Sequence, residues 1–329
     1  MSLKQGRFMV WLKEPFNGFH LVATPFDSLK NLEALVLLGF FMLSVSAVCS
    51  AEQLGPYTYT LTGGKATITS FNENYSGSLS MTNELSGYPV TSIGYLVFRK
   101  CKGLTNIRIP DSVTSIRLGA FFNCHSLKNV TIGAGVTSIE DTAFSYCFAL
   151  TNIEVSTRNE SFSSLGGVLF NRSQANLKTF PAGKAGAYVV PDNVVSIGDN
   201  AFLGCIGLSS IWMPDRLTSI GGDAFGLCKG LTDVRIPDAV MSIGHGAFSG
   251  CEGLTNVMIG AGVTNIGAHA FNHCDNLRSM YFKGSVPTCR ETSFNSCTNL
   301  TLYYSSRATN GWTNPYAGRP TKSWNPSAQ

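Results

Sequence analysis

Apolar and polar positions recur along this chain with a period of 23 residues. The copy at residues 113–132 generalises to V-x-S-I-x-x-x-A-F-x-x-C-x-x-L-x-x-V-x-I. Eight copies keep the cysteine together with the phenylalanine three positions before it. The cysteines are Cys101, Cys124, Cys147, Cys205, Cys228, Cys251, Cys274 and Cys297, and the phenylalanines are Phe98, Phe121, Phe144, Phe202, Phe225, Phe248, Phe271 and Phe294. A fixed period of roughly 20–50 residues is the signature of a stacked repeat protein.

Each copy contains the pattern of one short strand. In residues 127–132, Val130 and Ile132 flank the polar Thr131, and this alternation predicts a strand with one buried face. Gly-Ala-Gly at 133–135 follows, where other copies have Pro-Asp-x, and either turn ends the strand.

The rest of the copy predicts how the rung closes. Residues 136–139 hold a second short apolar run, and the apolar residues of 143–147 suit one helical or 3-10 turn on the opposite side. One such rung cannot bury its apolar side alone, whereas stacked rungs form a continuous core. We therefore predict an α/β to mainly β fold, a right-handed solenoid with a parallel sheet on one face and helical or 3-10 turns on the other.

This motif resembles the BspA-like leucine-rich repeat family, a group of bacterial surface and secreted proteins with 23-residue repeats. Leu127, Val130 and Ile132 follow its L-x-x-L-x-L spacing, and residues 263–274 (Val-Thr-Asn-Ile-Gly-Ala-His-Ala-Phe-Asn-His-Cys) carry the remainder of the motif. The resemblance extends from about Tyr57 to the C-terminus. It implies a leucine-rich-repeat solenoid and favours surface adhesion or the binding of host or matrix proteins. It names no ligand, because every matching residue is a core or turn position.

The first 51 residues form a leader without repeat character. Residues 34–48 are apolar, Lys30 precedes them, and small residues at 49–51 suit signal-peptide cleavage after Ala51. An uncleaved anchor or a buried helix is an alternative, although the run is shorter than the about 20 residues of a membrane span. Cys49 raises a lipoprotein alternative. We expect the translation start nearer Lys30, no membrane span after cleavage, and a secreted or cell-surface location.

The mature chain divides into caps and repeats. Residues 52–89 are predicted to be an N-terminal β cap, with a hairpin across 57–71 that turns at Gly63-Gly64. Leucine-rich repeats occupy 90–304. The spacing between Cys147 and Cys205 is longer than elsewhere, so a long rung at about 156–193 is expected to carry a protruding hairpin at about 156–184. Residues 305–329, rich in aromatic residues, Gly and Pro, suit a C-terminal cap.

Charge argues against a nucleic-acid partner. The net charge is +4, and removing residues 1–51 leaves 20 basic and 17 acidic residues, or +3. That balance gives no basic surface for nucleic acid or anionic lipid. Nothing in the sequence calls for a cofactor, and we expect a monomer.

The eight repeat cysteines are expected to form one inward-facing structural ladder. Adjacent rungs lie close enough for disulfides, but parallel Cβ vectors are poor disulfide geometry, so buried free thiols are favoured. Cys289 is off the ladder and is either reactive, bridging to another chain, or a partly buried bystander.

Metal and catalytic sites find little support. His269, His273 and Cys274, with His245 one rung away, have helical metal-ligand spacing, but Cys274 belongs to the ladder and its neighbours are variable positions. Lys184 follows no phosphate-binding loop, and no nucleophile motif occurs. We predict no catalytic residues and no metal.

Recognition is expected on the outward strand positions, which vary between copies. That column comprises Arg108, Thr131, Glu154, Val189, Trp212, Arg235, Met258 and Tyr281. Trp, Tyr and Arg are enriched at binding hot spots. The candidate binding residues are therefore Arg108, Trp212, Arg235, Met258 and Tyr281, and the last four lie on adjacent rungs. The alternative is a solvated sheet face whose aromatic residues cover their neighbours.

These observations lead to two functional hypotheses. The first is a secreted, non-catalytic module that binds a protein or glycan through its strand face. The second is a structural or self-assembling envelope protein without another ligand. An enzyme is a third reading, which no group of residues supports.

Overall fold

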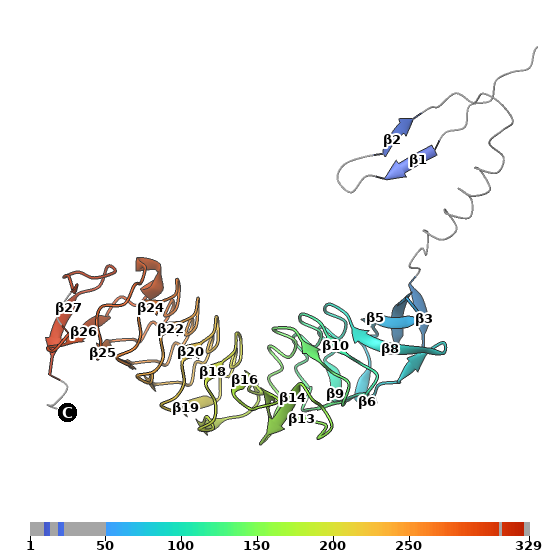
Figure 1. Ribbon diagram of the computed structural model, residues 1–329, viewed down its shortest axis with the longest axis horizontal. Helices are drawn as coiled ribbons and strands as arrows, with labels where there is room; N and C mark the ends of the chain where they lie inside the picture. Colours follow the sequence, from blue (N-terminus) through green and yellow to red (C-terminus); the bar gives the residue numbers. More distant parts are fainter. Residues whose placement is uncertain (1–9, 14–18, 23–50, 309–310, 326–329) are drawn as a thin grey trace, which may run out of the picture. The chain divides into compact units, whose positions relative to one another are not determined.

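The computed structural model describes residues 10–13, 19–22, 51–308 and 311–325, and the chain separates into two units, Met1–Cys49 and Ser50–Gln329 (Figure 1). In the first unit, β1 (Val10–Lys13) pairs antiparallel with β2 (Phe19–Val22). The expected signal-peptide core at 34–48 lies outside the described residues.

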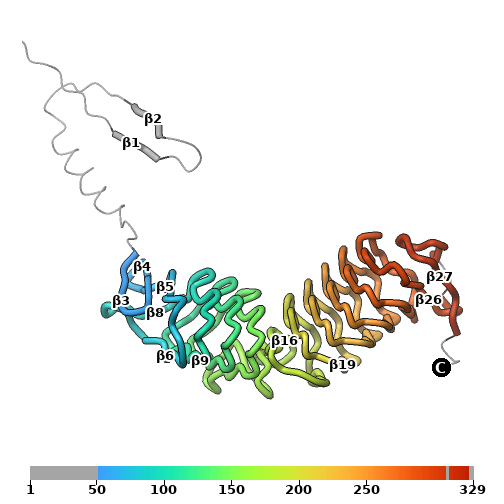
Figure 2. The backbone as a smooth tube through the Cα atoms, turned by 180° about the vertical axis from the view of Figure 1, so that it is seen from behind, coloured from blue at the N-terminus to red at the C-terminus, as the bar shows by residue number. Residues whose placement is uncertain are grey.

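The second unit is the predicted solenoid, and each regular rung contributes one longer and one shorter strand. Partners in both ladders are one repeat apart, as in Val130↔Ile153 and Ser115↔Ser138. The longer strands are β6 (Ser76–Ser80), β9 (Gly103–Ile109), β11 (Asn129–Ile132), β13 (Asn152–Val155), β17 (Gly186–Val189), β19 (Leu208–Trp212), β21 (Asp233–Arg235), β23 (Asn256–Ile259), β25 (Ser279–Phe282), β26 (Thr301–Ser305) and β27 (Thr321–Trp324). The strands of the second ladder are β8 (Tyr88–Ile93), β10 (Ser115–Ile116), β12 (Ser138–Ile139), β16 (Asn176–Thr179), β18 (Ser196–Ile197), β20 (Ser219–Ile220), β22 (Ser242–Ile243) and β24 (Asn265–Ile266). Figure 2 shows the rungs as a row of stacked coils.

The third side of each rung is built from turns, which corrects the expectation of helical or 3-10 turns. Among the described residues the only helix is a 3-10 helix, Glu291–Phe294, in the last rung. The reason is a left-handed backbone just before each ladder cysteine, which ends any helical turn. The residues in this conformation have φ between +53° and +76° and are Lys100, Asn123, Tyr146, Gly204, Leu227, Gly250, His273 and Ser296.

A second left-handed position lies four residues earlier in most rungs, for example at Gly119 and Asp223. Backbone amides between these bends donate to the following rung, as Phe121 does to the Ala143 oxygen at 2.8 Å. The turn side is therefore hydrogen-bonded between rungs, like the two strand ladders.

The core is a column of stacked phenylalanines lined by the aliphatic residues of the strands. Phe98 and Phe121 stack with centroids 4.9 Å apart, as do Phe225 and Phe248. Buried residues fall into two clusters, one from Tyr57 to Leu169 and a second from Val168 to Leu302. The solenoid therefore has two halves, each with its own core.

The long rung joins the two halves. Strands β14 (Phe162–Leu165) and β15 (Val168–Asn171) are antiparallel, and β15 is also antiparallel to β16. The expected hairpin is present as β14 and β15, but β15 is packed between the two cores and does not protrude. Leu169 packs into the first core and Phe170 into the second, because successive side chains of a strand face opposite sides.

Phe180 takes the place of the repeat phenylalanine that the long rung lacks. It stacks on Phe202 at 4.9 Å, and its N–H donates to the Ala201 oxygen at 2.7 Å. Gly183 stands at the cysteine position and donates to the Leu150 oxygen at 2.8 Å, across the junction.

Both ends of the second unit contain the elements that we predict as caps. The hairpin across 57–71 is confirmed as β4 (Tyr57–Thr62) and β5 (Lys65–Phe71), and two short strands, β3 (Glu52–Leu54) and β7 (Glu84–Leu85), accompany it. At the other end Trp312 lies against Phe282, with centroids 4.9 Å apart. That these segments act as caps stays a prediction.

Candidate ligand-binding site on the strand face

Four of the five candidate binding residues lie together on the longer-strand face of the second half. Arg235, Met258 and Tyr281 are direct partners on β21, β23 and β25, so their side chains point to the same side. Trp212 ends β19 on the preceding rung and is 55% exposed. A large apolar side chain so exposed on a regular sheet buries little area within the fold.

These residues line one open groove with a volume of about 810 Å³. Besides the four candidates, its polar lining comprises Ser210, Asp233, Asn256 and Lys283. Aromatic and thioether side chains with a few convergent polar groups are the usual composition of a binding site.

Arg235 is the least engaged cation of the groove. Its guanidinium lies 3.9 Å from the Asp215 carboxylate, and both side chains are largely exposed, so this ion pair contributes little to the stability of the fold. Lys283, in contrast, binds Asp238 at 3.3 Å and is only 29% exposed. The carboxylate of Asp233 accepts from the Asn256 amide at 2.9 Å.

Tyr281 contributes to packing as well as to the groove. It stacks on Tyr303 with centroids 4.8 Å apart and meets the edge of Trp324 at 5.2 Å. Tyr281 therefore covers neighbouring side chains, as expected if the strand face were only a solvated sheet surface. Sequence reasoning missed Tyr303 and Trp324, although Tyr303 continues the same outward column as the partner of Tyr281.

Arg108 is not part of this groove. It lies on β9 in the first half, with Thr131 as its strand partner. It lines a separate hollow of about 330 Å³ together with Arg158 and Asp111, which form an ion pair at 2.6 Å. The structure therefore divides the candidate residues between two places.

Two residues before the outward column, the strands of the first half carry asparagines, which form a structural ladder. The Asn129 amide donates to the Asn106 oxygen at 2.7 Å, and Asn106 donates to Ser78 Oγ at 2.8 Å. These side chains bond between rungs and are not available as a group for a ligand.

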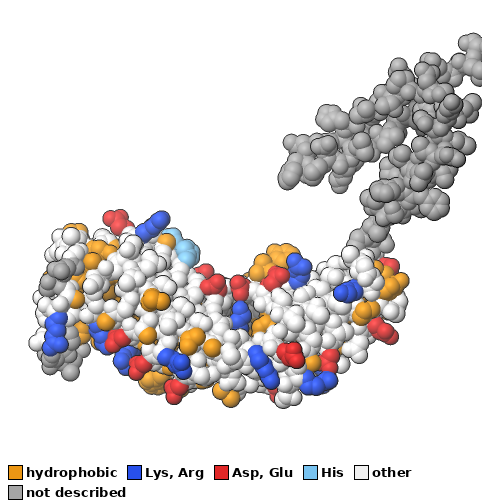
Figure 3. Space-filling model, viewed as in Figure 1, with side chains coloured by type: hydrophobic (Ala, Val, Ile, Leu, Met, Phe, Trp, Pro, Cys, Tyr) orange, Lys and Arg blue, Asp and Glu red, His pale blue; other side chains and the backbone are white. Residues whose placement is uncertain are grey.

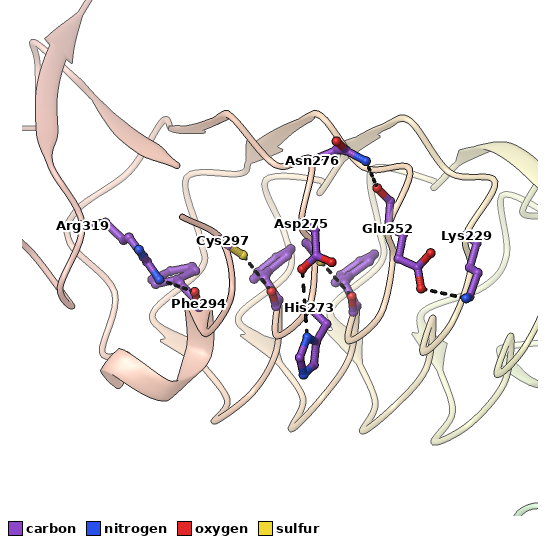
Figure 4. Close-up of polar contacts among 11 residues, drawn as sticks. Lys229, Glu252, His273, Asp275, Asn276, Phe294, Cys297 and Arg319 are labelled. Carbon is purple, nitrogen blue, oxygen red and sulfur yellow. Dashed lines mark hydrogen bonds and ion pairs between the residues drawn. The ribbon is translucent and has the colours of Figure 1, made fainter. Parts of the chain in front are cut away.

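The repeat cysteines are fully buried and unpaired, and seven of them, from Cys124 to Cys297, bond to the backbone of the preceding rung. The Cys124 thiol donates to the Phe98 oxygen at 2.9 Å, and the Cys297 thiol to the Phe271 oxygen at 3.0 Å (Figure 4). Phe294 belongs to the last rung with a ladder cysteine, so no thiol of a following rung reaches its oxygen. The Arg319 guanidinium donates to this oxygen at 2.6 Å instead, as Figure 4 shows. The prediction of buried free thiols is confirmed, but sequence reasoning missed this bond.

Burial also makes the Cys101 thiol a poor nucleophile. Desolvation raises the pKa of Cys101 to about 12. A thiol reacts as its thiolate, so a raised pKa leaves it inert near neutral pH. Cys289, which lies off the ladder, is half-buried beside Tyr316, and burial also raises its pKa.

The histidines do not converge on a thiol. The His245 and His269 rings meet at 5.4 Å, while His273 is exposed and 4.0 Å from Asp275 (Figure 4). The Cys274 thiol donates a hydrogen bond to the Phe248 oxygen at 3.1 Å. Across residues 51–308 and 311–325, no three His, Cys, Asp or Glu residues group as metal ligands.

Surface charge is mixed. Figure 3 shows basic and acidic side chains interspersed over the visible face of the second unit. In the described parts of the chain, no helix has the length and apolar character needed to cross a membrane.

Comparison with known proteins places these features in a family. The family model described as the BspA type leucine rich repeat region, with 6 copies, matches residues 71–187 and 178–301. No curated protein matches. A leucine rich cell surface protein from Faecalibacterium prausnitzii A2-165 is 25% identical, with 78% of this chain and 94% of that chain covered and a TM-score of 0.48.

A second solved structure shares the fold. The leucine-rich repeat protein from Eubacterium ventriosum ATCC 27560 is 22% identical, with 77% of this chain and 83% of that chain covered and a TM-score of 0.56. At this identity the similarity extends to the solenoid and not to a ligand.

Proposed function

This chain belongs to the BspA type leucine-rich repeat family, and we propose that it is a non-catalytic binding module that acts outside the cytoplasm. Its ligand is a protein or glycan held on the strand face of the second half. The location rests on the signal peptide predicted at 34–48 and on the bacterial surface and secreted proteins that the repeat motif resembles.

The observation that carries the proposal is the groove that Trp212, Arg235 and Met258 line on successive rungs. Trp and Arg are among the side chains that dominate binding energies at interfaces, and a flexible Met beside them can adapt to a partner. None of the three is needed to fill a core, because Trp212 and Arg235 are exposed and Met258 is half-buried.

The test is capture of ligands by the immobilised protein from proteins and glycans of its native surroundings. The Trp212→Ala/Met258→Ala variant should lose capture by about 10-fold or more, because hot-spot truncations cost about 2 kcal/mol or more. The matched control is Thr131→Ala/Glu154→Ala, which changes the same column in the first half. If the wild type, the Trp212→Ala/Met258→Ala variant and the control capture ligands equally, the strand face is not the binding site.

One observation favours the alternative of self-assembly. Among the described strands, β6 pairs only with β9, and β27 only with β26, so each leaves one strand edge open. Open edges are templates for pairing between chains. Light scattering separates the alternatives, since a self-assembling protein grows with concentration and captures no other ligand.

A further inference from the structure

The longer-strand sheet is split at the groove. β19 pairs only with β17, and β21 only with β23, so no ladder joins β19 to β21 among the described strands. One rung later, the Thr255 N–H donates to the Thr232 oxygen at 2.7 Å and the Ile236 N–H to the Met258 oxygen at 2.8 Å. The equivalent bonds at the split, Thr232 to Ser209 and Met213 to Arg235, are not formed.

A bulge lies on the other edge of the same strand, β19. In the pairing of β17 with β19, Gly186 faces Leu208 and Ala187 faces Ser210, so Ser209 is an extra residue on β19. A bulge disrupts the ladder and twists its strand. The other sides of the same rungs stay closed, as shown by the Ser219↔Ser242 pairing and by the Gly204 N–H, which donates to Gly226 at 2.8 Å. The opening is therefore confined to the strand face.

The opening leaves backbone donors beside the groove. The N–H groups of Met213 and Thr232 have no partner within the described chain, and Met213 directly follows the exposed Trp212. Across the split, the Arg235 guanidinium is only loosely paired with Asp215, at 3.9 Å. An N–H group and a loosely paired guanidinium suit an anionic oxygen ligand, because charge-assisted bonds are the stronger ones.

We propose that the groove takes an extended peptide segment through an acidic side chain, which is a refinement that rests on the binding function proposed above. The ligand's carboxylate bonds to the Arg235 guanidinium and to the Met213 N–H. Its neighbouring apolar side chain lies against Trp212 and Met258. A peptide fits better than a neutral glycan because the groove places a loosely paired guanidinium beside apolar side chains, while its carboxylate, Asp233, already accepts from the Asn256 amide.

The experiment measures binding of the full chain to three pools of end-blocked hexapeptides. The pools carry Asp, Asn or Lys at one central position and Leu, Val or Thr elsewhere. The wild-type protein should bind the Asp pool about 10-fold or more tightly than the Asn pool, as a charged hydrogen bond contributes about 1.5–3 kcal/mol. Arg235→Glu should reverse the preference to the Lys pool.

Arg108→Glu is the matched control, since Arg108 begins the same Arg-Ile-Pro-Asp sequence in the first half, where the strand ladder is closed. It should leave the preference for Asp unchanged. Pools bound equally by the wild type, or a preference that Arg235→Glu does not reverse, would overturn the acidic-peptide proposal.

A neutral-glycan array gives an outcome that separates the two proposals. Glycan binding that Trp212→Ala abolishes, with no peptide pool bound, would retain the binding module and overturn the peptide ligand. No binding of any probe, together with capture that Trp212→Ala/Met258→Ala leaves intact, would overturn both.

Discussion

The two halves of the solenoid share a scaffold and differ in what they present to solvent. Both repeat Arg-Ile-Pro-Asp, at 108–111 and at 235–238, on the same strand position. In the first half the arginine has Ser80 and Thr131 as its strand partners. In the second half it has Met258 as its partner and shares a groove with Trp212. We therefore propose that recognition depends on outward residues that the core does not constrain.

The largest expected effect tests whether the two cores are equivalent. Phe121→Ala and Phe248→Ala each remove a ring from the middle of a stack in which every side is filled. Each should lower the free energy of unfolding by about 3–5 kcal/mol. Urea titration of both variants measures the loss. If the two losses differ by more than about 1 kcal/mol, the halves are not the same scaffold, since similar sites should collapse alike.

The next effect concerns the junction of the two halves. A Cβ on Gly183 would lie 2.7 Å from the Ala149 carbonyl carbon and 2.8 Å from the Leu150 oxygen, both backbone atoms. Gly183→Ala should therefore cost up to about 3 kcal/mol through strain. It should also separate the unfolding of the two halves, because repeat proteins are stabilised by nearest-neighbour interfaces.

Fluorescence and circular dichroism measured along one urea titration follow this separation. Gly186→Ala is a control of the same chemistry, since no atom lies within 4 Å of a Cβ there, although its φ of +90° carries its own strain. If Gly183→Ala unfolds in a single transition with the wild-type midpoint, the close contact at Gly183 does not couple the two halves.

The sequence predicts the scaffold well because its determinants are periodic. The 23-residue spacing of Phe and Cys gives the core, and strand alternation places Trp212, Arg235 and Met258 on one outward face, as found. The left-handed turns are harder to see. Gly204 and Asn123 suit positive φ, but Lys100 and Leu227 adopt it too, held by the bonds between rungs.

Two features of the candidate site have no sequence signal. Rungs 205–227 and 228–250 have equal length, so the sequence gives no sign of the bulge at Ser209 or of the split between β19 and β21. Three positions after Phe180 stands Gly183 and not the repeat cysteine, which hides the role of Phe180 in the second core. Both depend on how the long rung packs, which is a tertiary property.

A smaller effect separates packing from exposure within the groove. Tyr281→Ala loses the contacts with Tyr303 and Trp324 and should lower the free energy of unfolding by about 1–2 kcal/mol. Trp212→Ala should change it by less than about 0.5 kcal/mol, as for other exposed positions. Thermal and urea unfolding of the two variants give the comparison. A large loss in Trp212→Ala would assign that side chain to the fold.

The smallest effect returns to the shared Arg-Ile-Pro-Asp sequence. Asp111 accepts the Ala134 N–H at 2.7 Å, and this bond, aided by Arg158, lowers the pKa of Asp111. Burial acts to raise the pKa of Asp238, but the bond from the Ala261 N–H and the charge of Lys283 outweigh it and lower that pKa as well. Each aspartate thus ties its rung to the next turn.

A depressed folded pKa contributes stability that is present above the unfolded value of about 3.9 and is lost as the pH falls through the folded value. Asp111→Asn and Asp238→Asn keep an oxygen for the N–H but remove the charge. Each should cost less than about 1 kcal/mol at pH 7, because the carboxylates are exposed. Unfolding measured at pH 7 and at pH 3 should show the cost shrinking at the lower pH in both halves alike. A cost that persists unchanged at pH 3 would mean that shape, and not charge, holds these turns together.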